Sequence, residues 1–152
     1  MRPVQITTGR HPFEVAVLIA ALACGIALLA TEYRPPSVVS AMPTIVQAGW
    51  EVGLIVAGVV GLVGVTWKGQ LSTALGVELL GVAVLGSVTT MYAIALAVIA
   101  GLSATAAGAF VGGVAVGAWW RVGQIGRDLM RVARAAESGV MADVPLLVER
   151  DR

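Results

Sequence analysis

The stretch LSTALGVELLGVAVLGSVTTMYAIALAVIAGLSATAAGAFVGGVAVGAWW, residues 71–120, decides the fold because Glu78 is its only charged residue. As one helix these 50 residues would measure about 75 Å at about 1.5 Å per residue, whereas a hydrocarbon core is about 30 Å thick. Two membrane-spanning helices must therefore share the stretch. Gly101-Leu102-Ser103 is the best break, which predicts spans over 71–100 and 104–120.

Upstream of this stretch the sequence contains two further apolar runs. Val15 to Thr31 carries no charge and, together with Phe13, predicts a first span over 13–31. The basic start with Arg2 and Arg10, followed by an apolar run, also resembles a signal peptide, with Ala30 as a conceivable cleavage residue. Paired prolines at 35 and 36 end this helix, and a short loop is expected before a second span over 44–67.

Downstream, the composition changes after the tryptophans at 119 and 120, a residue type that favours the membrane interface. Apolar residues then recur at helical spacing among arginines, which predicts a basic amphipathic helix at the membrane surface. We therefore predict an all-α membrane protein with four transmembrane helices over 13–120 and a C-terminal region 121–152 that contains this surface helix. The residues assigned to the membrane surface are Trp119, Trp120, Arg121, Arg127, Arg131 and Arg134.

The charges predict the topology and exclude several functional classes. Hydrophobic residues make up 58% of the chain and charged residues 12%, against about 25% in soluble domains, which excludes a soluble globular protein. Basic residues near both ends and Lys68 between the second and third spans predict cytoplasmic termini, including segment 1–12, in a bacterial inner membrane. The ten basic and nine acidic residues leave no net basic field, so we expect no nucleic-acid partner.

No catalytic or cofactor-binding constellation is visible in the sequence. His11 and Cys24 are the only residues of their types, so neither a disulfide nor a cysteine or histidine metal cluster is expected. Scattered carboxylates without an oriented base do not form a nucleophilic site. We therefore expect a protein that is not an enzyme and that has no cofactor.

Small residues recur every four positions in two of the predicted spans. Such ridges allow close approach of helix backbones, either within one bundle or between subunits, and both alternatives remain open. A homo-oligomer or a complex with other membrane subunits is expected in addition to contact with the lipid bilayer. The ridge of the second span comprises Gly49, Gly53, Ala57 and Gly61, and that of the fourth comprises Gly101, Thr105, Ala109, Gly113 and Gly117.

Two carboxylates lie within the predicted spans. Glu51 follows Trp50 near the outer end of the second span, so we expect an interfacial position. Glu78 lies about 12–15 Å beyond Lys68 along the third span, well inside the core. Its expected partners are nearby hydroxyl groups or water. It serves either as a hydrogen-bonding group that holds helices together or as part of a polar, water-accessible path.

The order of several segments resembles small membrane proteins encoded by phages of actinobacteria. These segments are Ile6–Glu14, Arg34–Ser37, Met91–Ala95, Trp119–Arg127 and Val144–Glu149. In its short glycine- and alanine-rich spans and charged tail, the chain also looks like holins. The resemblance implies a non-enzymatic, self-associating protein that permeabilises the host membrane. A structural or accessory subunit of a virion or host complex and a small channel or transporter using Glu78 are the alternatives.

Overall fold

A computed structural model of the chain describes residues 12–31, 33–101 and 105–137. The described part is helical and contains no strand, so the prediction of an all-α protein is confirmed. The helices are α1 (Pro12–Thr31), α2 (Pro36–Ala41), α3 (Thr44–Thr66), α4 (Leu71–Ala100) and α5 (Thr105–Glu137). The predicted cytoplasmic segment before residue 12 and the tail after residue 137 lie outside the described residues.

Three of these helices, α1, α3 and α4, are long and apolar enough to cross a membrane. Each is predominantly apolar, and many of its large hydrophobic side chains remain exposed on the outside of the bundle. Ile45 is 83% exposed and Val98 is 74% exposed, an arrangement that favours lipid rather than water as the surrounding medium. The chain therefore has three helices suited to crossing a membrane.

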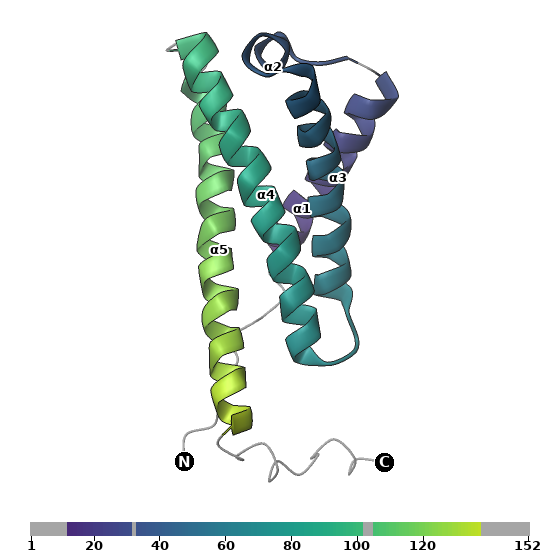
Figure 1. Ribbon diagram of the computed structural model, residues 1–152, viewed down its shortest axis with the longest axis vertical. Coiled ribbons are helices and arrows are strands. Elements are labelled where there is room, and N and C mark those ends of the chain that lie inside the picture. Colours follow the sequence, from purple (N-terminus) through teal and green to yellow (C-terminus); the bar gives the residue numbers. More distant parts are fainter. Residues whose placement is uncertain (1–11, 32, 102–104, 138–152) are drawn as a thin grey trace.

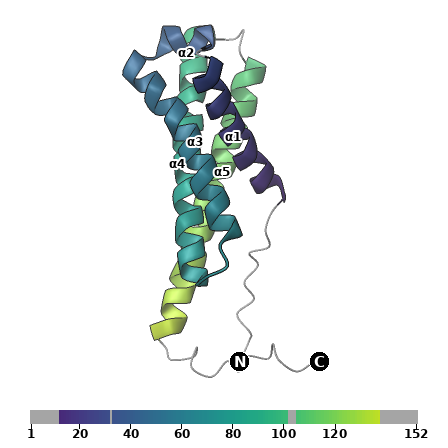
Figure 2. The same cartoon turned by 90° about the vertical axis from the view of Figure 1, so that its right-hand side faces the viewer.

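The long helices run alternately up and down (Figures 1 and 2). The pair α3 and α4 forms the centre, with α1 packed against α3 on one flank and α5 packed against α4 on the other. The first turn of α1, the turn between α3 and α4 and the end of α5 all point toward the same end of the molecule. The short helix α2 lies at the opposite end.

The structure differs from the sequence-based prediction around Trp120. The predicted fourth span and the predicted surface helix form one continuous helix, α5, which runs through Arg121 without a break. No proline interrupts residues 105–137, and glycines at 123 and 126 weaken a helix without ending it. Figure 1 shows α5 without a bend, so residues 121–137 continue the axis of residues 105–120 instead of forming a separate helix.

One smaller difference concerns the loop expected before the second span, whereas the helix end expected at residue 100 is found. Pro36 begins the short helix α2 inside the region expected to be a loop, because proline is favoured at the first turn of a helix. At the other predicted break, α4 ends at Ala100 and Gly101 has a φ of +51°, in the left-handed region that favours glycine. The rest of that break, residues 102–104, lies outside the described residues.

Glycines form the seam between α3 and α4. A Cβ at Gly81 would overlap the backbone of Gly61, and a Cβ at Gly64 would overlap the backbone of Glu78. On the α1 side, a Cβ at Gly58 would lie 2.9 Å from the backbone oxygen of Leu18. The close approach of these helices therefore requires residues without side chains.

The predicted ridge of the second span lies partly in this core. Ala57 and Gly61 are buried, and a Cβ at Gly53 would lie 2.6 Å from a methyl group of Val88. Gly49 is the exception, since a Cβ there would meet nothing within 4 Å among the described residues outside its own helix backbone. This ridge thus serves packing within the chain.

Candidate functional site

The ridge of the fourth span faces away from the core. Ala109, Gly113 and Gly117 are exposed on α5, and a Cβ at either glycine would meet nothing within 4 Å among the described residues beyond the backbone of α5. Thr105 begins the helix and is also exposed, whereas Gly101 lies at the end of α4. Small residues therefore lie against another helix at the α3–α4 seam, whereas the ridge on α5 is not covered by any described helix.

One side of this exposed ridge borders a groove between α1 and α5. The groove has a volume of about 490 Å³, and α4 contributes part of its wall through Val82 and Leu85. Its lining is mostly apolar. The residues from α1 are Phe13, Glu14 and Val17, and those from α5 are Ala109, Phe110, Gly113, Val114, Gly117, Ala118, Trp120, Arg121 and Gln124.

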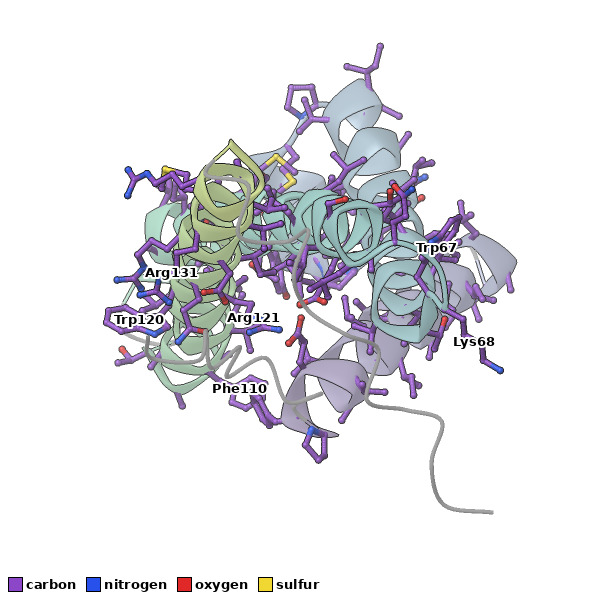
Figure 3. The ribbon with its side chains drawn as sticks, turned by 90° about the horizontal axis from the view of Figure 1, so that it is seen from below. Trp67, Lys68, Phe110, Trp120, Arg121 and Arg131 are labelled. Carbon is purple, nitrogen blue, oxygen red and sulfur yellow. The ribbon has the colours of Figure 1, made fainter. Side chains whose placement is uncertain are left out.

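Three charged side chains from three helices meet at the groove. Arg121 of α5 donates a hydrogen bond of 2.6 Å from Nη2 to Oε1 of Glu78 on α4. Its Nε lies 2.9 Å from Oε2 of Glu14 on α1, close enough for an ion pair. Figure 3 shows Arg121 extending from α5 toward α1, while Trp120 and Arg131 point outward. We call Glu14, Glu78 and Arg121 the charged triad.

The charged triad is shielded from solvent, and its hydrogen bonding is incomplete. The side chains of Glu14, Glu78 and Arg121 are only 13%, 9% and 12% exposed. Despite the short distance to Glu14, Nε of Arg121 has no hydrogen-bond partner among the described residues, so its N–H does not point at the carboxylate. Oε1 of Glu14 also has no partner there.

These contacts correct one prediction from sequence. The partner of Glu78 is Arg121 rather than a hydroxyl group such as that of Ser72, Thr73 or Ser87. The side chain of Arg121, which the sequence assigns to the membrane surface, turns inward and lies against both carboxylates. Without Arg121, the two shielded carboxylates would have no positive charge beside them, which is costly in a site of low polarity.

The remaining residues assigned to the membrane surface do lie on the outside of α5. Trp120 is 67% exposed, and Trp119 is 47% exposed while its Nε1 donates a hydrogen bond of 3.1 Å to Oγ1 of Thr90. Arg131 pairs with Asp128 at 3.1 Å within the helix. Arg127 donates to the backbone oxygen of Gly123 at 3.1 Å, and Arg134 is exposed.

At the opposite end of the bundle, Glu51 is more deeply buried than its position beside Trp50 suggests. Glu51 is 1% exposed and accepts hydrogen bonds of 2.6 and 3.3 Å from Arg34, which precedes α2. A guanidinium group therefore covers the carboxylate of Glu51, and its position at the membrane interface stays a prediction. Beside it, the rings of Trp50 and Tyr92 lie 5.2 Å apart and fix α3 against α4.

Sequence reasoning missed Glu14 and Arg34 as members of these charge clusters. A signal was present for Glu14. Helices that alternate in direction bring the start of α1, the early part of α4 and the middle of α5 to one level, where Glu14, Glu78 and Arg121 are the available charges. An arginine and two carboxylates at one level within the membrane are expected to pair, because an ionisable group without a partner is costly there.

Comparisons of the chain with protein-family models, with curated proteins and with solved structures find no match. Within residues 12–31, 33–101 and 105–137, no three histidine, cysteine, aspartate or glutamate side chains come together as a metal site. The functional interpretation therefore depends on the open face of α5, the groove and the charged triad.

Proposed function

We propose that this chain is a non-enzymatic membrane protein that self-associates through α5 and permeabilises the membrane in the manner of a phage holin. The observation that supports this proposal is the open ridge of Ala109, Gly113 and Gly117, which no described helix covers. Lipid-facing surfaces gain little from small residues, whereas helix–helix contacts gain close backbone approach and dispersion energy.

A second copy suits this face because large side chains flank the small ones. Phe110 is 76% exposed and Trp120 is 67% exposed on the same side of α5 as the open ridge. Two copies related by a two-fold axis would each offer projecting aromatic side chains and a ridge of small residues to the other. Such an isologous contact closes into a dimer, and other exposed faces remain available for larger assemblies.

In this proposal α5 also makes a fourth membrane crossing. Residues 105–120 are uncharged, and the whole helix of 33 residues is about 50 Å long, longer than a hydrocarbon core of about 30 Å. Its second half would therefore project from the membrane with Arg127, Arg131 and Arg134. The positive-inside rule assigns that end, which also carries Lys68, to the bacterial cytoplasm.

The self-association proposal is tested with Gly113→Leu. Because the position is open, the added side chain should leave the chain folded but keep a second copy at a distance. We expect chemical crosslinking in liposomes to yield less dimer, and leakage of an entrapped dye to lose its steep dependence on protein concentration. Gly49→Leu is the matched control, since Gly49 is equally open but lies on α3.

Different outcomes separate this function from its alternatives. Dimers without dye leakage at any protein density would favour a structural or accessory subunit. Leakage that depends on a single copy and changes in Glu78→Gln would favour a channel or transporter. The second alternative has less support, because Glu78 is 7% exposed and is held by Arg121.

The topology is tested by cysteine labelling in a Cys24→Ser background, since Cys24 is exposed on α1. Val39 lies on α2 and is 56% exposed, and Arg134 lies near the other end of the molecule. A membrane-impermeant maleimide added to intact cells should label Val39→Cys but not Arg134→Cys. Labelling of Arg134→Cys alone, or of both positions, would contradict four crossings with cytoplasmic ends.

A further inference from the structure

We propose that three arginines in the second half of α5 bind the phosphates of anionic phospholipids. We call Arg127, Arg131 and Arg134 the arginine stripe, and all three are exposed. This inference rests on the proposed membrane crossing by α5, but it does not rest on self-association. The supporting observations are the level of the arginine stripe relative to two tryptophans, the direction of its side chains and its alignment with the open ridge.

The level at which the hydrocarbon core ends follows from two exposed tryptophans. A Cβ at Gly64 of α3 would overlap the backbone of Glu78, and Arg121 donates a hydrogen bond to Glu78, so these residues share one level of the bundle. Trp67 follows Gly64 by three residues, about 5 Å, and Trp120 directly precedes Arg121. Figure 3 shows Trp67 and Trp120 on opposite flanks of the bundle. Because tryptophan favours the membrane interface, the end of the hydrocarbon core belongs near this level.

The side chains of the arginine stripe fold back toward that level. Nε of Arg127 donates a hydrogen bond of 3.1 Å to the backbone oxygen of Gly123, and Nη1 of Arg131 lies 3.1 Å from Oδ1 of Asp128. The guanidinium group of Arg127 therefore lies only about 6 Å beyond Trp120 along α5. The headgroup layer extends about 5–7 Å beyond the hydrocarbon core, so this group reaches it.

The arginine stripe also continues the open ridge of α5. Arg131 comes 18 residues after Gly113, which is five turns of about 3.6 residues, so both point the same way from the helix axis. Arg127 and Arg134, four residues before and three residues after Arg131, share that face. If the proposed dimer forms, two parallel α5 helices bring their stripes together, and anions between the guanidinium groups offset the repulsion.

Lipid phosphates are the anions that fit this position. They lie in the layer that Arg127 reaches, and a guanidinium group can donate two parallel hydrogen bonds to one phosphate. Residues 122–137 contain these three arginines against two acidic residues, Asp128 and Glu137, so their net charge is only +1. A preference for anionic lipid should therefore depend on the placement of the arginines and not on a strong overall charge.

The test measures which lipids contact the full-length protein in liposomes of phosphatidylcholine. Spin-labelled phosphatidylglycerol or spin-labelled phosphatidylcholine is added in trace amounts, and electron spin resonance gives the fraction of each that the protein immobilises. One basic side chain near an anionic headgroup strengthens association about fivefold, so the average over all contacting lipids should favour phosphatidylglycerol at least about twofold. Salt at about 1 M, where the Debye length is about 3 Å, should weaken this preference.

Three variants distinguish the arginine stripe from general attraction between charges. Arg127→Gln removes the guanidinium group that reaches the headgroup layer and should remove about half of the preference or more. Lys68→Gln removes one exposed charge from the turn at the same end of the bundle and should remove less. Asp128→Asn releases Arg131 from its carboxylate partner and should increase the preference.

Equal immobilisation of the two lipids by the wild type would overturn the proposal. Equal losses in Arg127→Gln and Lys68→Gln, or a weaker preference in Asp128→Asn, would do the same. Gly113→Leu should keep the wild-type preference, because a single copy carries the whole stripe, so loss of the dimer in that variant tests only self-association. Cysteine labelling at position 134 reports separately on the membrane crossing by α5.

Discussion

The seam between α3 and α4 and the gap between α1 and α5 use similar residues for opposite purposes. In the seam, Gly61 and Gly81 bring two helix backbones into direct contact, and no side chain could be added. Across the gap, Gly113 and Gly117 face open space, and the charged triad connects the flanking helices. Small residues therefore indicate where helices can approach, but they do not show whether the approaching helix belongs to the same chain.

The two regions also differ in the interactions that stabilise them. The seam is stabilised by many weak apolar contacts along its length, because α3 and α4 pack extensively. The two flanking helices are not among the pairs that pack extensively, and Arg121 connects them at one level. Substitutions in the two regions should therefore differ in both size and kind.

The largest expected effect comes from removing the cation of the charged triad. Arg121→Met keeps an apolar side chain of similar length but leaves Glu14 and Glu78 without a cation in a shielded site. Breaking a buried ion pair on one side costs about 3–5 kcal/mol. Unfolding of the purified protein by titration with sodium dodecyl sulfate should measure this loss. Stability equal to the wild type would show that the flanking helices do not depend on the triad.

A substitution in the seam should have the next largest effect. In Gly81→Ala the new methyl group overlaps the backbone of Gly61, so α3 and α4 must separate. Overpacking of this kind costs about 1–3 kcal/mol. The same detergent titration should detect this cost. An unchanged unfolding midpoint would mean that the seam adapts and is not the rigid centre of the bundle.

The smallest expected effect is that of Gly113→Ala, the matched substitution on the open ridge. A methyl group there meets nothing within 4 Å among the described residues outside its own helix backbone. The free energy of unfolding of the monomer should not fall by more than about 0.5 kcal/mol, and it rises by up to about 1 kcal/mol if the higher helix propensity of alanine is fully expressed. A loss as large as that of Gly81→Ala would show that another segment covers the ridge and would remove the contrast between the two regions.

Much of the fold is determined by the sequence alone. Hydropathy requires membrane helices because an uncharged run of this length can satisfy its backbone groups in lipid only as a helix. The helices α1, α3 and α4 follow from predominantly apolar runs, and the prolines at 35 and 36 come shortly after the first of them. Composition likewise identifies Glu78 as an unusual residue within its span. These conclusions depend on local properties that each segment carries by itself.

Only the tertiary structure decides the pairing of these segments. It assigns Arg121 to Glu14 and Glu78, residues 107 and 43 positions away in the chain, and it assigns Arg34 to Glu51. It also distinguishes the covered ridge of α3 from the open ridge of α5, although both have the same spacing. The reason is that periodicity determines which residues share a face of one helix, whereas the direction of that face is determined by how the helices pack.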